Sequence, residues 1–300
     1  YLSVYNDVKG IGTLSYFSST YGSAQKLQGI IAFSVIMNNV DSFHLSPGST
    51  RFPEPRTTLY SGPFLHEVMH RWANFIIEPK AHWTWNSANG ILGGFDIATL
   101  VDHGDGRYSA IGNVPSYDGF SNGGWAGNYI PYSPIELYLA GLIPPEEVPD
   151  IWVAEDGKAV LDKDGFWDAK SFTANRVKTY TIEDIIAEHG PRIPDHTQSQ
   201  KNFRAAVILL ISEDYPATTE MLEILSEDVS FMSHAGYDQN DEFYNFYEAT
   251  GGRATITMDG LSSLKRQGAA KPLVPSSYGT PPPIVECEID HHGLLQPHIH

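Results

Sequence analysis

The feature that most constrains the fold is the pentad His66-Glu67-Val68-Met69-His70. Histidines four residues apart project from one face of an α-helix, so both imidazoles can reach a single metal ion. Zinc held by two such histidines needs a third protein ligand and keeps a position for water. Glu67 is placed to take a proton from that water. The pentad therefore predicts a helix that carries a hydrolytic zinc site.

The residues around the pentad favour a long helix. Ser61 is expected to cap it, Pro63 suits its first turn, and Pro79 is expected to end it. Apolar residues recur between them at helical spacing and predict one buried stripe. They are Leu65, Val68, Met69, Trp72, Phe75 and Ile76.

The third zinc ligand must come from another part of the chain. The compact metzincin arrangement needs glycine at position 73 and histidine at position 76, where this chain has Ala73 and Ile76. Glu136, at the start of a separate predicted helix, is therefore taken as the third ligand, as in gluzincin-like sites. Its alternative role is structural, because Ser133 to Glu136 also reads as a capping box.

His82 is the alternative third ligand. It follows the predicted end of the pentad helix in the string His82-Trp83-Thr84-Trp85. If the helix continued to Glu78, that residue would lie roughly 12 Å along the axis from His70, and four residues would have to recover the distance. A histidine packed among tryptophans in a cleft wall is the other interpretation of His82.

Two further groups of residues are candidates for supporting roles. A donor for the developing oxyanion is expected from a tyrosine or a histidine of the cleft, with Tyr132, Tyr138, His103 and His196 available. A structural Ca²⁺ is a weaker candidate, and the acidic residues that suggest it lack the distal glutamate of a complete calcium loop. These residues are Asp102, Asp105, Asp118, Asp162, Asp164 and Asp168.

Composition limits the partners of the chain. Its 300 residues carry a formal net charge of −17, which argues against nucleic acid or an anionic membrane as the main partner. No apolar run approaches the 18 or more residues of a membrane span. The expected partner is a peptide or protein substrate, and nothing in the sequence sets the number of subunits. The single cysteine, Cys287, rules out an internal disulfide framework.

Patterning along the chain predicts an α+β fold. Residues 1–150 are expected to form a zincin-like catalytic region, with a mixed sheet beside the pentad helix and a strand at 27–35. Residues 151–261 are expected to complete the domain as an α/β portion, and residues 262–300 form a Pro/Ser-rich tail or linker. The elements expected in the second region are a hairpin at 151–172, helices at 181–189, 218–234 and 241–249, and strands at 203–212 and 253–258.

The longer motifs add a family resemblance. The string His66 to Trp72, then His82-Trp83, then Tyr132 to Leu142 resembles the zincin clan of zinc metallopeptidases and is similar to a group of exported bacterial proteins, over roughly residues 60–150. The resemblance implies zinc on His66 and His70 and Glu67 as general base. It also implies a secreted or periplasmic protein. The start at Tyr1, without a basic or apolar leader, is expected for a mature exported form.

The leading hypothesis is therefore a zinc-dependent peptidase, expected to be an endopeptidase, that uses activated water and Glu67 as general base. The alternative is a non-catalytic exported surface or binding protein on a zincin scaffold, in which zinc is structural or absent. Full occupation of the metal by four protein ligands favours the alternative, and a position left for water favours the enzyme.

Overall fold

The structure is a computed structural model that forms two compact units, Tyr1–Leu264 and Lys265–His300. It describes residues 2–5, 28–33, 37–38, 56–57, 59–73, 76–77, 82–112, 127–165, 167–209, 216–238, 243–259, 285–289 and 295–299. In the second unit, strands β13 (Val285–Ile289) and β14 (Leu295–Ile299) pair antiparallel, within the segment expected to be a tail or linker.

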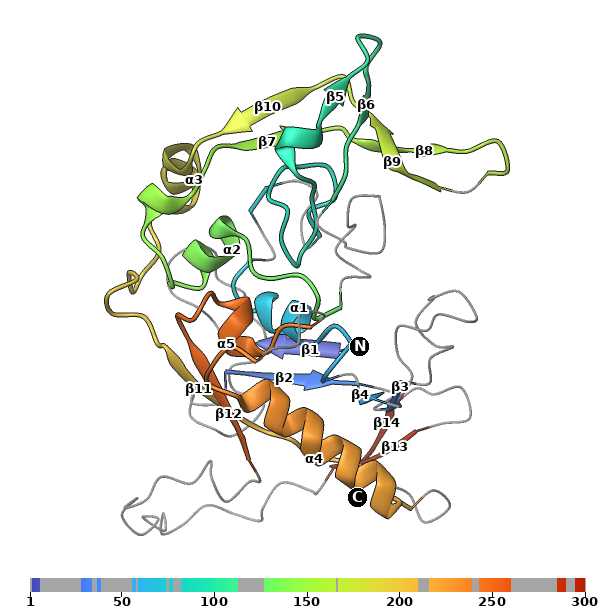
Figure 1. Cartoon of the computed structure of the whole chain (residues 1–300), viewed down its shortest axis with the longest axis vertical. Helices are drawn as coiled ribbons and strands as arrows, with labels where there is room; N and C mark the ends of the chain where they lie inside the picture. Colours follow the sequence, from blue (N-terminus) through green and yellow to red (C-terminus); the bar gives the residue numbers. More distant parts are fainter. Residues whose placement is uncertain are drawn as a thin grey trace. The chain divides into compact units, whose positions relative to one another are not determined.

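Helices and strands are both present in the first unit, so the coarse α+β class is correct (Figure 1). The helices are α1 (Phe64–Met69), α2 (Pro134–Leu139), α3 (Ile182–His189), α4 (Thr219–Ser233) and α5 (Phe246–Ala249), with 3-10 turns at Ile97–Thr99 and Pro145–Glu147. The strands are β1 (Leu2–Tyr5), β2 (Gly29–Ala32), β3 (Met37–Asn38), β4 (Arg56–Thr57), β5 (Val101–Asp102), β6 (Arg107–Ser109), β7 (Ile151–Ala154), β8 (Lys158–Leu161), β9 (Trp167–Thr173), β10 (Val177–Tyr180), β11 (Asn202–Ala206) and β12 (Thr255–Asp259).

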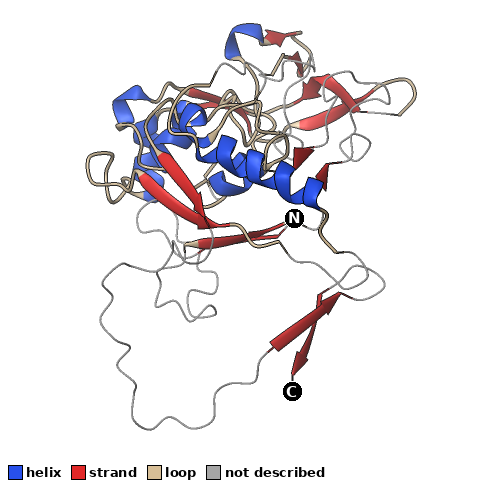
Figure 2. Cartoon of the chain, turned by 60° about the horizontal axis from the view of Figure 1, so that its bottom comes forward, coloured by secondary structure: helices blue, strands red, loops and turns tan. Residues whose placement is uncertain are grey.

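Small sheets make up the strand content of the described part of the first unit. Strands β5, β6, β9 and β8 form an antiparallel sheet in that order. Three further antiparallel pairs join β1 to β2, β3 to β4, and β7 to β10. Strands β11 and β12 pair in parallel, and the longest helix, α4, packs against β12 (Figure 2). The helices connecting β11 to β12 supply the crossover that a parallel pair requires.

The main hydrophobic core surrounds α1 and α2. Leu65 and Met69 of α1 are fully buried, as are Ile135 of α2 and Trp83 and Ile91 of the loop that follows α1. Burial of large apolar side chains from all three segments stabilises their mutual placement, at about 1.5–3 kcal/mol for each fully buried side chain. The core therefore fixes the helix of the pentad against the loop that contains Trp83 and Ile91.

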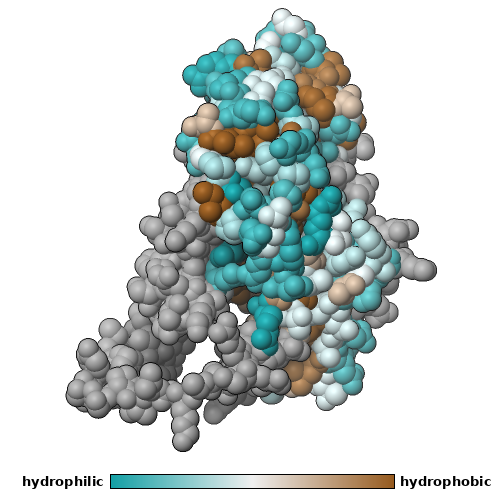
Figure 3. All heavy atoms as spheres, turned by 90° about the vertical axis from the view of Figure 1, so that its left-hand side faces the viewer, coloured by the Kyte–Doolittle hydropathy of each residue, from teal (hydrophilic) through white to brown (hydrophobic). Residues whose placement is uncertain are grey.

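A second, smaller cluster of buried residues lies between the four-stranded sheet and β7. The ring of Phe172 stacks on that of Phe95 and on that of Tyr108, with centroids 5.7 and 5.5 Å apart. Their offset aromatic contacts add to the area that they bury. At the surface, hydrophobic side chains form small patches separated by hydrophilic ones on the face shown in Figure 3. None of the described helices is both long and apolar enough to cross a membrane.

The predicted length of the pentad helix is wrong. Helix α1 ends at Met69, and the chain turns through shorter hydrogen bonds, from Arg71 N–H to the carbonyl of Val68 and from Trp72 N–H to the carbonyl of Met69. These three-residue spacings tighten the last turn and redirect the chain. Trp72 can then bury against the core and need not continue a helical stripe.

Several other predicted elements are confirmed. Thr181 and Thr218 cap α3 and α4, because each side chain accepts a hydrogen bond from the backbone three residues later. Strand β2 falls inside the predicted range 27–35, and β12 begins two residues after the start of the predicted range 253–258 and ends one residue beyond it. The hairpin predicted at 151–172 is wrong in part, because β8 pairs with β9 as expected, whereas β7 pairs with β10.

Candidate metal centre

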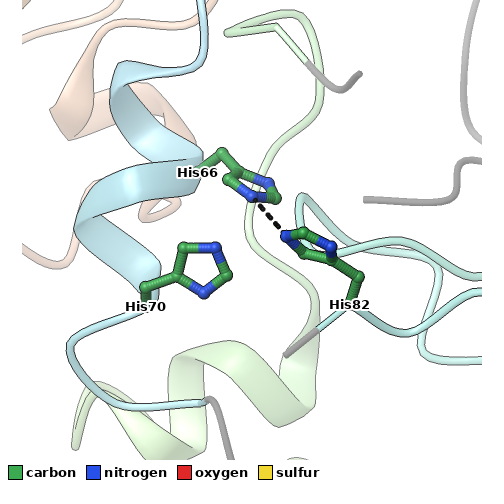
Figure 4. A group of neighbouring side chains, drawn as sticks. All are labelled: His66, His70 and His82. Carbon is green, nitrogen blue, oxygen red and sulfur yellow. Dashed lines mark hydrogen bonds between the residues drawn. The ribbon is translucent and has the colours of Figure 1, made fainter. Parts of the chain in front are cut away.

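Helix α1 presents the first two candidate ligands on one face. His66 and His70 are one helical turn apart, and their ring centroids lie 4.5 Å from each other (Figure 4). The apolar residues Leu65 and Met69 on the neighbouring positions are fully buried, which holds the rotation of the short helix about its axis. His66 is 3% exposed, and His70 is partly exposed.

His82 comes to the same point from the loop after α1. Its Nε2 lies 3.2 Å from Nε2 of His66, and its ring centroid lies 5.0 Å from that of His66 and 5.2 Å from that of His70. Figure 4 shows the rings of the three residues turned toward a common space between α1 and the loop. The early end of α1 explains how His82 can lie beside His70. Because the helix stops at Met69, the chain is not carried away from His70 along a longer helix axis before it reaches His82.

The donor set fits a zinc ion. One nitrogen from each of the three histidines lies within 4.8 Å of the other two, and no other group of three or more His, Cys, Asp or Glu side chains with this property occurs among the described residues. Tetrahedral zinc with Zn–N bonds of about 2.0–2.1 Å places its nitrogen ligands roughly 3.3–3.4 Å apart. The His66–His82 separation of 3.2 Å matches that value closely.

A backbone carbonyl orients His66. Its Nδ1 lies 3.0 Å from the carbonyl oxygen of Ile91. Because a carbonyl only accepts hydrogen bonds, Nδ1 must carry the proton, which leaves the Nε2 lone pair for a metal. Metal-bound histidines commonly make such a hydrogen bond with the second ring nitrogen.

The environment favours the neutral form of His66 and of His82. Burial lowers the pKa of His66 well below its ordinary value, and the neighbouring His70 and His82 lower it further, although the Ile91 carbonyl opposes the change. Burial also lowers the pKa of His82, with a second contribution from His70. Neutral imidazole is the form that binds metal, so the lowered pKa values favour ligation at neutral pH.

Glu67 lies beside the first ligand on α1. Its backbone N–H donates to the carbonyl of Pro63, and its side chain is 9% exposed. The position next to His66 and three residues before His70 is the one that the His-Glu-x-x-His pattern assigns to the general base.

The structure does not bring Glu136 to the three histidines. Its carboxylate is fully buried and accepts three backbone N–H groups, at 2.7 Å from Leu92, 3.1 Å from Ile91 and 2.7 Å from Ser133. The bond from Ser133 is the capping interaction that the sequence left open as the alternative to ligation. The geometry thus replaces Glu136 with His82 as the candidate third ligand, because the Glu136 oxygens are used to hold backbone.

Glu136 accepts hydrogen bonds from a tight turn, Gly90 to Gly93, in the loop after α1. Gly90 and Gly93 exchange two backbone hydrogen bonds of 3.0 Å, and the peptides between them point outward toward Glu136 and His66. A Cβ on Gly90 would overlap the carboxylate of Glu136 and the hydroxyl of Ser133. Glycine is therefore required here by the close approach of α2 to the turn.

Asn128 supports the start of α1 and was missed by reasoning from the sequence. Its Oδ1 accepts from the N–H of Leu65 at 2.9 Å, and its Nδ2 donates to the carbonyls of Leu59 and Tyr60. The expected cap was Ser61, but the side chain that satisfies a free N–H of the first turn comes from a distant segment. No local sequence pattern signals a cap supplied 63 residues away.

Three of the four oxyanion donors considered from the sequence have other partners. The hydroxyl of Tyr132 donates to the carbonyl of Leu65 at 2.9 Å, and the hydroxyl of Tyr138 accepts from the N–H of Arg192 at 3.2 Å. Both tyrosines are buried, so they brace α1 and α2. His103 lies 3.0 Å from the hydroxyl of Ser109, in the turn between β5 and β6.

Five of the acidic residues considered for calcium are described, and four of them make the same local hydrogen bond. The fifth, Asp164, forms an ion pair with Lys163, with its Oδ2 3.2 Å from Nζ. Asp102, Asp105, Asp162 and Asp168 each accept a backbone N–H two residues later, at 2.8–3.1 Å. Such Asx interactions are the ordinary use of aspartate in turns. Asp118 lies outside the described residues, so the calcium hypothesis stays a prediction.

The site is thus made of three histidines, a neighbouring glutamate and a buried support of backbone and amide groups. Two of the histidines come from one turn of α1 and the third from the loop that Trp83 and Ile91 anchor in the core. Searches of protein-family models, curated proteins and solved structures find no match to the chain.

Proposed function

We propose that the chain is a zinc-dependent hydrolase that cleaves peptide bonds on a zincin-like scaffold. The observation that carries the proposal is the convergence of His66, His70 and His82, with ligand nitrogens within 4.8 Å of one another. Three protein ligands are typical of catalytic zinc, whereas structural zinc has four. The His-Glu-x-x-His pattern supports amide hydrolysis as the reaction.

Each residue of the site has a separate task in the proposed reaction. When bound, zinc would make water more acidic and polarise the substrate carbonyl. Glu67 takes the proton of the attacking water and delivers it to the leaving amine. His66, His70 and His82 would fix the position of the metal, and so of its water, relative to Glu67. These histidines are buried or partly buried, which limits the access of bulk water to the site.

A structural zinc protein without catalysis is the second candidate. The deep burial of His66 and its hydrogen bond to Ile91 are compatible with either role. The two candidates differ at Glu67, which catalysis requires and structural binding does not.

The test combines metal content with hydrolysis. The zinc-loaded protein is incubated with a mixture of unstructured peptides, and cleavage products are identified by mass spectrometry. The Glu67→Gln variant is expected to bind zinc as the parent does and to lose at least about 100-fold in turnover, the range for loss of a general base.

The control is Glu155→Gln. Glu155 lies after β7, accepts a hydrogen bond from the hydroxyl of Tyr180, and is not part of the group of three histidines. This variant should keep full activity. Cleavage by the Glu67→Gln variant at the parent rate would overturn the proposed mechanism, and a zinc-loaded parent that cleaves no peptide would favour the structural role.

A further inference from the structure

We propose that Glu136 is a positioning residue of the metal centre, which acts on His66 through the peptide group between Ile91 and Leu92. The inference rests on the proposed metal site but does not depend on catalysis. Glu136 was considered as a metal ligand from the sequence, and its observed contacts give it a different task.

The two ends of one peptide group contact Glu136 and His66. Leu92 N–H donates to Oε1 of Glu136 at 2.7 Å, and the carbonyl of Ile91 accepts from Nδ1 of His66 at 3.0 Å. These two groups belong to the same planar amide and point in opposite directions along it. Glu136 and His66 are thus connected through a single rigid unit.

A second bond holds the neighbouring peptide group, between Gly90 and Ile91. Oε2 of Glu136 accepts from Ile91 N–H at 3.1 Å, and it also accepts from Ser133 N–H at 2.7 Å. The carboxylate therefore binds two successive N–H groups of the turn and anchors them to the first turn of α2. Rotation of the Ile91–Leu92 peptide would break the bond to Glu136 and the bond to His66 together.

The hydrogen bonds of this unit reinforce each other. An acceptor on the N–H side of a peptide group increases the negative charge on its carbonyl oxygen. A stronger acceptor at Ile91 favours the form of His66 that has its proton on Nδ1. That form leaves Nε2 free to face Nε2 of His82, 3.2 Å away.

Glu248 shows what a capping glutamate does without such a connection. It occupies the same third position of helix α5, and its carboxylate accepts from the N–H groups of Asn245 and Asp238. The hydrogen bonds that the structure describes for these two residues do not involve His66, His70 or His82. Glu248 is therefore a matched control for the loss of a buried capping carboxylate.

The experiment compares Glu136→Gln with Glu248→Gln by two readouts. Long-range ¹H–¹⁵N spectra of the metal-free protein report which ring nitrogen of His66 carries the proton, and competition with a chromophoric chelator gives the zinc affinity. A glutamine amide places its NH₂ against backbone N–H donors, so the turn should lose its present orientation.

In the parent and in Glu248→Gln, we expect the Nδ1–H form of His66 and equal zinc affinity. In Glu136→Gln, we expect a mixture of the two neutral forms and an affinity lowered about 10- to 100-fold, the range for loss of a group that supports a ligand. If Glu136→Gln does not fold, Glu136→Asp is measured in the same way, and a smaller change in the same direction is expected.

Retention of the Nδ1–H form and of zinc affinity within twofold in a folded Glu136 variant would overturn the inference. Equal losses in the Glu136 and Glu248 variants would also overturn it, because they would reflect capping alone. If the parent binds no zinc, the proposed function fails, and the proton position on His66 still decides the role of Glu136.

Discussion

The carboxylate of Glu136 and the imidazole of His66 hydrogen bond to opposite ends of the same peptide group, between Ile91 and Leu92. This relationship joins α2 to α1 through a turn of the loop after α1. It explains why a fully buried carboxylate lies near a group of histidines without belonging to it. Changes in the turn should therefore affect the metal centre, even where they do not touch a ligand.

Gly90→Ala should disturb this connection. The new Cβ would overlap the Glu136 carboxylate and the Ser133 hydroxyl, so the turn and α2 must separate. We expect a loss of about 1–3 kcal/mol in the free energy of unfolding, measured with urea, together with weaker zinc binding. Gly236→Ala is the control, because its Cβ would meet the end of the flexible His234 side chain at 3.0 Å. Equal zinc affinity in the two variants would argue against the connection.

His82→Ala should weaken zinc binding more than any change in the supporting groups. It removes one of three converging nitrogens, so the affinity should fall by more than the roughly 10- to 100-fold expected for a supporting residue. His103→Ala, which changes a histidine in the β5–β6 turn, should leave the affinity unchanged. Isothermal titration with zinc checks both values, and an unaltered affinity in His82→Ala would remove it from the site.

Glu136 should make the stability of the metal-free protein depend on pH. Burial raises its pKa from 4.5 to about 7, against the lowering effect of the N–H donors. The protonated folded state is thus favoured, and this contribution is fully present below pH 4.5 and is lost as the pH rises through about 7. Relative to Glu136→Gln, the parent should lose on the order of a few kcal/mol between these values. Urea unfolding of both proteins across the range checks the difference, and parallel curves would contradict it.

Asn128→Ala should destabilise α1. The change removes the acceptor for Leu65 N–H and the donors to the carbonyls of Leu59 and Tyr60. We expect a loss of about 1–3 kcal/mol in the free energy of unfolding, because buried backbone groups are left without partners. Ser61→Ala, at the cap position expected from the sequence, should cost less, because α1 begins after Pro63 without a side-chain cap at that position. A larger loss in Ser61→Ala than in Asn128→Ala would contradict the observed capping.

Local patterns explain which parts of the fold were predictable. Three helices begin where the sequence predicts. Helices α2 and α3 follow Ser133 and Thr181, and each has an acidic residue three positions after this cap. Helix α4 follows Thr218 and has regularly spaced apolar residues. Strand pairing across distance was harder, because the hairpin turns of 151–172 do not specify that β7 pairs with β10. The end of α1 was also missed, since its apolar residues continue at helical spacing after the helix stops at Met69.

Local patterns also predict part of the candidate site, whereas its third ligand depends on contacts between distant residues. His66, Glu67 and His70 form a local motif with a fixed chemical meaning, and the structure places the two histidines together as the motif predicts. The choice between His82 and Glu136 depends on where α1 ends and on which backbone groups need an acceptor. Both are tertiary properties, so the sequence left them open and favoured Glu136, whereas the geometry favours His82.

The central claim is that His66, His70 and His82 hold one zinc ion. X-ray absorption at the zinc edge of the stoichiometrically loaded protein tests it most directly, because imidazole scattering identifies histidine ligands. We expect three imidazole nitrogens at about 2.0–2.1 Å from zinc and one light-atom ligand from solvent. A shell with only two imidazoles, completed by protein carboxylate, would contradict it.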